Sequence, residues 1–287
     1  MIVYKPTFPL VSFNIFSLKD FQDVQLAERV LQAINEAGND FIPDTYGADE
    51  VSAKTKYDPA HHEPLIRLWT DERDEATDVQ RSFASAWFLM KKKRKPNTCY
   101  QMRWKKDQEA NFNHLTFSLN LDYLRKPENW ERFMNLSNHL LLLLEPVQAN
   151  IWNLMMPEWS EPIDLQVRHP ELGWINYFGK PYIDLFGRER LLSAPCYRTF
   201  EIGEDIIGLQ MSEDLFQPIP SDVRYAVKKH LGEDAFVEEG KWYRYYKTGR
   251  IPAFDFSGVL QDPSKPIEGP KIWKRGPNGP VLVPKSS

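Results

Sequence analysis

The sequence predicts an α+β protein made of two halves, each a mostly antiparallel sheet with helices packed on one side. Three observations predict it. Apolar residues alternate with polar ones in several short segments, as in half-buried strands. Apolar residues recur at helical spacing in a few longer segments. The order of these segments is β-α, several strands, α-β, then β-α-β-β-α, which suits two sheet-and-helix units.

We place the boundary between the halves near residue 155. Residues 1–155 form the N-terminal half and residues 156–260 the C-terminal half. Residues 261–287 are rich in Pro, Gly and Lys, a composition typical of a flexible tail.

The N-terminal half begins with a strand and a helix. Residues 11–16 alternate apolar and polar side chains, which indicates a half-buried strand. Ser17 and Asp20 then supply an S-x-x-D helix start, and Gly38 a helix stop. Five apolar residues form the stripe of this helix: Phe21, Val24, Ala27, Leu31 and Ile34.

Further strands follow an irregular polar loop over residues 39–64. They are predicted at residues 65–69, 83–90, 99–104, 114–121 and 147–154. Pro127 opens the strongest helix, in which apolar residues recur at helical spacing until Pro146.

The C-terminal half is organised around residues 173–187, GWINYFGKPYIDLFG. Residues 174–178 indicate a strand, the glycine after them a turn, and the proline the first turn of a helix that the last glycine ends. We therefore assign structural roles to Gly173, Trp174, Tyr177, Gly179, Pro181 and Gly187. Residues 197–202 and 206–211 form a hairpin, and Pro220 begins a helix that ends at Gly232.

Composition narrows the classes of function. The 287 residues include 36 Lys and Arg against 40 Asp and Glu, a formal net charge of −4. This balance gives no bulk electrostatic reason to bind nucleic acid or an anionic membrane. The N-terminus lacks a basic leader and a cleavage site, and the longest apolar run, residues 140–144, is too short to span a bilayer. Cys99 and Cys196 could form a disulfide, but their isolated positions favour free thiols in a reducing compartment, so we expect a cytoplasmic protein.

No motif predicts a catalytic, metal-binding or cofactor-binding residue. His61, His62 and Glu63 are adjacent, and adjacent side chains do not converge on one ion. Cys196 opens a predicted strand, a poor position for an activated thiolate. The glycine-rich signatures of phosphate and dinucleotide sites are absent. We therefore expect a protein that is not an enzyme and needs no cofactor.

Two groups of residues are candidates for binding a partner. Acidic residues in turns are either solvated surface, acid–base pairs or a patch that meets a basic partner; they are Asp71, Glu72, Asp74, Glu75, Glu204 and Asp205. Aromatic residues beside basic ones are either core or interface anchors; they are Trp242, Tyr243, Arg244 and Tyr245.

A basic segment offers another function. Residues 91–95 are all Lys or Arg, and the basic residues 103, 105 and 106 follow. Tyr100 and Trp104 are interspersed among these basic residues. Aromatic and basic residues together suit stacking on nucleic-acid bases. The other interpretation, which the acidic balance of the chain favours, is a charged hairpin tip that discourages edge pairing.

The stretch GWINYFGKPYIDLFG resembles the C-terminal half of bacterial type VI secretion immunity proteins, which have related groups among polymorphic-toxin immunity proteins. The resemblance continues through YRTFEI, the turn GED and IIGLQM, and extends upstream to HLTFSLNLDYL and the loop PDTYGADE, so that it covers roughly residues 11–237. The chain departs from the family pattern where Arg188, Glu189 and Arg190 follow Gly187, and in its proline-rich tail.

The resemblance implies an α+β protein without enzymatic activity. Such a protein binds a cognate antibacterial toxin and neutralises it by covering the active site of the toxin. Acidic and aromatic surface groups would then steer and anchor the complex.

Overall fold

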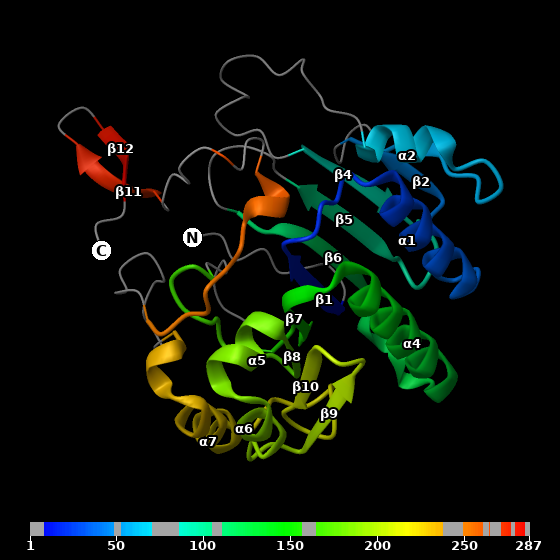
Figure 1. Ribbon diagram of the computed structural model, residues 1–287. Helices are drawn as coiled ribbons and strands as arrows, with labels where there is room; N and C mark the ends of the chain where they lie inside the picture. The colour runs from blue at the N-terminus through cyan, green and yellow to red at the C-terminus, as the bar shows by residue number, and fades with distance from the viewer. Residues whose placement is uncertain are drawn as a thin grey trace.

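The ordered part of the chain is built around one ten-stranded sheet (Figure 1). The computed structural model describes residues 9–48, 53–70, 86–104, 111–156, 165–237, 249–260, 264, 271–276 and 279–284. The strand order is β3-β2-β4-β5-β6-β1-β7-β8-β10-β9, and every neighbouring pair is antiparallel. The predicted α+β class is confirmed.

The strands of the sheet are short except at its centre. They are β1 (Leu10–Ser17), β2 (Thr45–Gly47), β3 (Thr55–Lys56), β4 (Ala86–Lys91), β5 (Cys99–Trp104), β6 (Asn113–Asn120), β7 (Pro146–Asn153), β8 (Ile175–Gly179), β9 (Arg198–Ile202) and β10 (Ile206–Gln210). A separate hairpin is formed by β11 (Lys271–Gly276) and β12 (Gly279–Pro284).

Six α-helices and three short 3-10 helices are described. The α-helices are α1 (Val24–Glu36), α2 (Glu63–Thr70), α4 (Pro127–Leu144), α5 (Lys180–Phe186), α6 (Arg188–Leu192) and α7 (Ser221–Leu231). The 3-10 helices are η1 (Leu121–Arg125), η2 (Glu233–Ala235) and η4 (Ser257–Val259).

The sheet is continuous across the predicted boundary near residue 155. β7 and β8 lie on either side of that boundary and pair directly, with Gln148 opposite Phe178 and Ile151 opposite Ile175. The expectation of a separate sheet in each half is therefore corrected: both halves of the chain contribute to one sheet. The alternation of side chains locates strands but does not state which strands pair.

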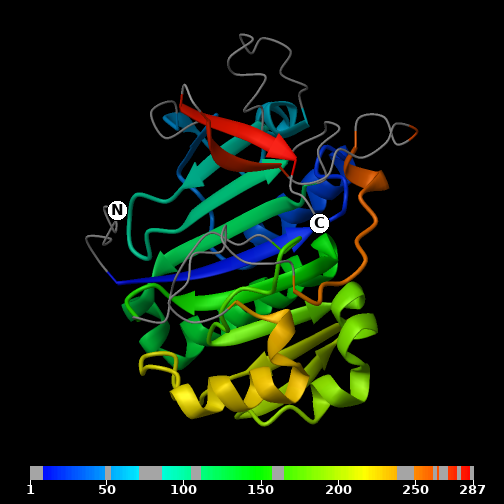
Figure 2. The same ribbon diagram turned by 90° about the vertical axis from the view of Figure 1, so that its left-hand side faces the viewer.

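The helices of the two halves cover opposite faces of this sheet. Phe117 of β6 packs on Phe133 of α4, with ring centroids 5.6 Å apart. On β8, Tyr177 contacts Phe13 on that same face, whereas the next residue, Phe178, packs on Phe186 of α5. Consecutive residues of a strand point to opposite faces. We call these the α4 face and the α5 face; the two groups of helices lie on either side of the sheet in Figure 1, and Figure 2 views the sheet from the side of the α5 face.

The α5 face is not covered by a described helix over β5, β6 and β1. Figure 2 shows these three strands in front of α1, with α5 and α7 confined to the lower part of the molecule. From the sequence we expected the helices of each half to pack on one face of a sheet. The sequence did not predict that the two halves place their helices on opposite faces.

One predicted strand is a helix. Residues 65–69 lie in α2, because Leu65, Ile66 and Trp69 are buried at the spacing of a helix face. Trp69 Nε1 donates a hydrogen bond of 2.6 Å to Phe21 O, which fixes α2 against the entry to α1. A short apolar run fits a strand or a helix equally well in sequence, and packing decides between them.

The start of α1 also differs from the prediction. Its N-cap is Asp23, whose Oδ1 accepts from Gln25 N at 2.8 Å and Leu26 N at 3.4 Å. Ser17, predicted to cap this helix, ends β1 and donates to Leu144 O instead. Val24 was predicted in the buried stripe, but as the first helical residue it is 47% exposed.

The remaining sequence predictions of regular structure match the described elements with small shifts at their ends. They are the strands that became β1, β4, β5, β6, β7, β8, β9 and β10, and the helices α4, α5 and α7.

Residues 173–187 form β8 and α5, and most of their aromatic side chains are buried. A Cβ on Gly179 would lie 1.7 Å from Pro146 O, so only glycine permits this approach of β8 to the start of β7. Gly187 separates α5 from α6 with φ = +90°, a conformation that favours glycine. Tyr177 is fully buried, and Trp174 donates to Ser212 O at 2.9 Å.

Candidate functional site

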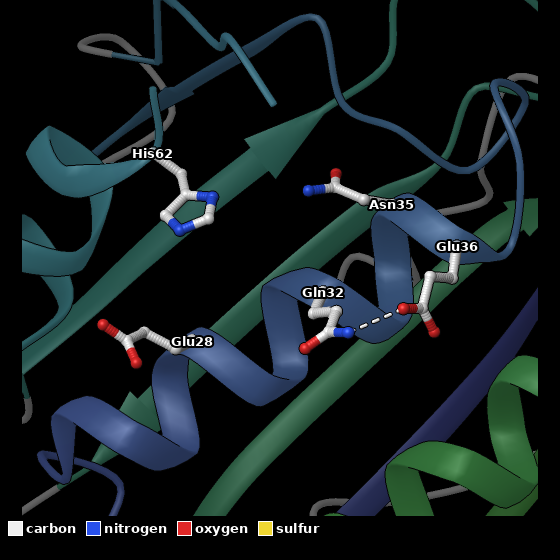
Figure 3. A pocket seen from close by; sticks show the side chains of 5 residues that line it. All are labelled: Glu28, Gln32, Asn35, Glu36 and His62. Carbon is white, nitrogen blue, oxygen red and sulfur yellow. Dashed lines mark hydrogen bonds between the residues drawn. The ribbon is translucent and has the colours of Figure 1, made fainter. Parts of the chain in front are cut away.

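A surface pocket lies between the outer face of α1 and the start of α2 (Figure 3). Its volume is about 420 Å³. The five lining residues are all polar: Glu28, Gln32, Asn35, Glu36 and His62. The side chains that line the pocket offer carboxylate, amide and imidazole groups to a ligand.

Helical spacing brings four of these side chains together. Glu28, Gln32, Asn35 and Glu36 stand at i, i+4, i+7 and i+8, which is one face of α1. The opposite face of α1 is buried against the core, so these side chains project outward. Gln32 Nε2 donates to Glu36 Oε1 at 2.7 Å (Figure 3).

The wall opposite α1 is anchored by the turn that precedes α2. His62 O accepts from Leu65 N and Ile66 N at 3.0 Å each, which holds His62 at the entry to α2. Tyr57 OH donates to Asn35 Oδ1 at 3.2 Å and ties the same loop to α1. Burial is the main cause that raises the pKa of Tyr57, so this hydroxyl stays a donor at neutral pH.

The pocket holds two carboxylates, those of Glu28 and Glu36. Among the described residues, no Lys or Arg forms an ion pair with Glu28 or Glu36. Two carboxylates eight positions apart on one helix face, with amides between them, can accept hydrogen bonds from a guanidinium or an ammonium group. The arrangement suits a cationic side chain of another protein.

The structure separates the acidic residues that the sequence proposed for partner binding. Glu204 and Asp205 are exposed in the β9–β10 turn, at the opposite end of the sheet from α2. Arg188 donates to the Glu201 carboxylate and to Glu204 O, so this turn is tied to the start of α6. The other proposed residues, Asp71, Glu72, Asp74, Glu75, Trp242, Tyr243, Arg244 and Tyr245, lie outside the described residues.

The α1 pocket was missed in the sequence although part of its signal was visible. The spacing of Glu28, Gln32 and Glu36 is that of a polar helix face, which most surface helices have. His62 comes from a loop predicted only as irregular, and no periodicity indicates that it lies opposite α1. Only the tertiary arrangement of α1 and α2 forms a pocket.

A second polar feature crosses the centre of the α5 face. Five residues stand in register on five neighbouring strands: Gln101, Thr116, Asn14, Asn150 and Asn176. Asn14 Nδ2 donates to Asn150 Oδ1 at 3.0 Å, and Thr116 Oγ1 donates to Asn14 Oδ1 at 3.2 Å. We call this set the polar row.

Two buried polar atoms beside this row have no partner. Asn150 Nδ2 and Gln148 Oε1 make no hydrogen bond within the described part of the chain, and both residues are fully buried. A buried polar group without a partner costs about 1–3 kcal/mol. Asn150 offers a donor and Gln148 an acceptor on the same face of β7, two positions apart.

Two histidines are held neutral by burial. Burial lowers the pKa of His169 to about 4; the hydrogen bond that Nδ1 donates to Pro170 O opposes this shift, and the charge of Lys228 adds to it. His169 lies among aromatic rings, with Phe178 and Phe236 centroids each 5.1 Å away. Burial and the nearby Arg103 lower the pKa of His114 to about 3, and its ring stacks on Phe16.

Metal ligands and thiols do not form a site in the described residues. No group of three or more His, Cys, Asp or Glu side chains is placed to hold a metal ion within that part of the chain. Cys99 and Cys196 are free thiols, as the sequence predicted, and burial raises the pKa of Cys196. Among the described helices, none combines the length and apolar character that crossing a membrane requires.

The basic segment is split between surface and core. Lys93, Arg94 and Lys95 are exposed at the tip of the β4–β5 hairpin. Tyr100 and Trp104, which the sequence offered as stacking groups, are only 0% and 2% exposed and pack in the core. The hairpin tip thus presents charge without the aromatic surface that base stacking needs.

Comparisons with known proteins find a distant likeness to solved structures. No protein-family model matches the sequence, and no curated protein matches it. A solved structure described as the Pseudomonas aeruginosa T6SS protein PA0821 is similar to this chain at 14% identity. The match covers 88% of this chain and 92% of that chain, with a TM-score of 0.46. A likeness at this level carries no argument about function.

Proposed function

We propose that this chain is an immunity protein that binds a cognate antibacterial toxin in the cytoplasm and neutralises it by occluding its active site. The observation that carries the proposal is the resemblance of residues 173–187 and their surroundings to type VI secretion immunity proteins. In the structure these residues form β8 and α5 and lie mostly in the core. The family-like residues are therefore scaffold, and the contacts with a toxin belong to exposed residues.

The α1 pocket is the described surface that best suits this role. Its unpaired carboxylates Glu28 and Glu36 match a basic group, and many enzymes that act on anionic substrates have basic active sites. A Lys or Arg of the toxin seated between these carboxylates would gain charge-assisted hydrogen bonds. Rim charges of this kind also steer association and raise its rate at low salt.

Co-expression with the toxin encoded beside this gene tests the proposal. Cells that produce the toxin should stop growing, and cells that also produce this chain should grow. The two proteins should co-purify as a complex. Absence of both rescue and co-purification would reject the function.

Charge reversal tests the pocket separately. The double variant Glu28→Lys, Glu36→Lys should fold, weaken the complex at least tenfold and reduce protection. The control Glu131→Lys reverses an exposed acid on α4, away from the pocket, and should protect like the unmodified chain. Full protection by the double variant would keep the immunity function but exclude this pocket from the interface.

A further inference from the structure

The sheet ends in an edge strand whose outer side pairs with no described strand. β9 pairs only with β10 and is the outermost strand at its end of the sheet (Figure 1). Alternate residues of an edge strand point their N–H and C=O groups away from the sheet. Within the described residues, residues 198–202 make no backbone hydrogen bond besides those with β10. One carbonyl, that of Arg198, accepts a weak bond from Cys196 Sγ at 3.4 Å.

Two features that usually prevent strand pairing, a proline and a bulge, are absent from this edge. The strand RTFEI contains no proline, and its register with β10 shows no bulge. β10 is buried along its whole length, whereas Arg198 and Glu201 of β9 are exposed. The other end of the sheet differs, because β3 has only two residues and offers little backbone for pairing.

Apolar side chains flank the open edge. Tyr197, just before β9, is 53% exposed, and Leu142 at the end of α4 is 49% exposed. Leu142 lies beside the β9–β10 turn, because its Cδ2 is 3.2 Å from the position of a Cβ on Gly203. Exposed tyrosine and leucine beside an unpaired strand are suitable anchors for a partner that adds a strand.

The charges along β9 are arranged with opposite signs at its two ends. Arg198 is the first residue of β9 and donates one hydrogen bond from its guanidinium to Gln210 Oε1. The other N–H groups of the guanidinium can donate to a partner. Three exposed acids, Glu201, Glu204 and Asp205, stand at the other end. Arg188 pairs with Glu201, and among the described residues neither Glu204 nor Asp205 forms an ion pair, so that end of β9 is acidic.

We propose that the outer edge of β9 pairs antiparallel with β9 of a second copy of this chain, so that two sheets join into one across a twofold axis at Phe200. Antiparallel pairing sets the basic start of one strand against the acidic end of the other. Arg198 of one copy then lies opposite Ile202 of the other, the residue that precedes the acidic turn with Glu204 and Asp205. The same strand in parallel orientation would place like charges together.

Oligomeric state in solution tests this pairing with the full chain alone. Light scattering after size exclusion, over a range of micromolar concentrations, should show a dimer that weakens as salt is raised. Arg198→Glu should weaken the dimer at least tenfold, and so should Glu204→Lys with Asp205→Lys. An equimolar mixture of the two variants should recover dimers, because each supplies the charge that the other has lost. Glu131→Lys is the matched control and should dimerise normally.

Hydrogen exchange keeps the test decisive if a variant folds poorly. In the unmodified chain, amides of residues 198–202 that face outward should gain protection as concentration rises, whereas amides of β3 should not change. A chain that stays monomeric, a dimer indifferent to both charge reversals, or an edge that gains protection only when a toxin is added would each overturn the proposal.

Discussion

Asn14 of β1 donates a hydrogen bond of 3.0 Å to Asn150 of β7 across the centre of the sheet. Asn150 is fully buried, and its own Nδ2 has no partner among the described residues. The bond therefore gives the Oδ1 of Asn150 a donor, while the Nδ2 of the same amide has no acceptor among the described residues. The polar row that contains this pair crosses five neighbouring strands of the sheet.

Removing either partner of this pair should destabilise the protein. Asn14→Ala leaves Asn150 Oδ1 buried without its donor, which should lower the free energy of unfolding by about 1–3 kcal/mol. Asn150→Ala removes both the acceptor and the unpaired donor, so its cost should be smaller. The double variant should cost less than the sum of the single variants. Urea unfolding of the four proteins measures the coupling, and strict additivity would contradict a direct interaction.

The N-cap of α1 gives a second prediction. Asp23→Ala removes the acceptor for Gln25 N and Leu26 N, and should lower the free energy of unfolding by about 1 kcal/mol. Ser17→Ala lacks this effect on α1, because Ser17 bonds to Leu144 O and not to the helix start. Gln25→Ala, an exposed helical change, is the control. Equal losses for Asp23→Ala and Gln25→Ala would argue against the cap.

His169 predicts how stability changes with pH. Its pKa is about 4 in the folded protein against a usual 6.5, so between these values the unfolded chain binds a proton that the folded chain does not. The free energy of unfolding should therefore fall as pH is lowered from 6.5 to 4, by up to about 3 kcal/mol from this group. Above pH 6.5 the histidine contributes no slope.

The variant His169→Phe separates this contribution from that of His114, whose pKa is also lowered, and from that of the carboxylates. Phenylalanine suits the surrounding aromatic rings and does not titrate. Chemical denaturation at several pH values should show a shallower loss between pH 6.5 and 4 in the variant. Parallel curves for the two proteins would show that His169 is not held neutral by the fold.

A close contact on β10 gives a fourth prediction. Phe200 lies over Gly208 so closely that a Cβ on Gly208 would come within 2.4 Å of the ring. Gly208→Ala should displace Phe200 and lower the free energy of unfolding by about 1–3 kcal/mol, as other overpacked sites do. In the Phe200→Ala background the same change should be nearly neutral. A thermal unfolding series of the three variants checks this coupling.

The sequence was informative where local periodicity decides structure. β1 and β6 alternate cleanly, and α4 has an apolar stripe between a proline and a left-handed Glu145, so these elements were predicted close to their observed bounds. The prediction of a strand at residues 65–69 was wrong, because five residues are too few to distinguish the period of a strand from that of a helix. The helix start predicted from the S-x-x-D motif at Ser17 was also wrong, because Asp23, three residues after the end of the motif, caps the helix.

The candidate site depended on relations that sequence does not contain. The α1 pocket needs His62 to lie opposite Glu28 and Gln32, and this follows only from how α2 packs. The polar row across the sheet needs the pairing order of five strands. The change of covered face between the halves is likewise set by tertiary packing, because either face of a strand such as β8 is apolar enough to be buried.

The exchange of covered faces has a consequence for how the molecule comes apart. β7 and β8 are buried along their whole length, and they join a half that is packed on one side to a half that is packed on the other. Cleavage of the chain near residue 155, followed by separation of the fragments, would leave the eight-residue strand β7 unpaired on one side in the first fragment and the five-residue strand β8 unpaired on one side in the second. Each fragment would also expose apolar side chains that are buried in the intact sheet. Neither fragment should fold alone, but mixing them should regenerate the intact sheet. The chain should thus unfold in a single cooperative step despite its two groups of helices.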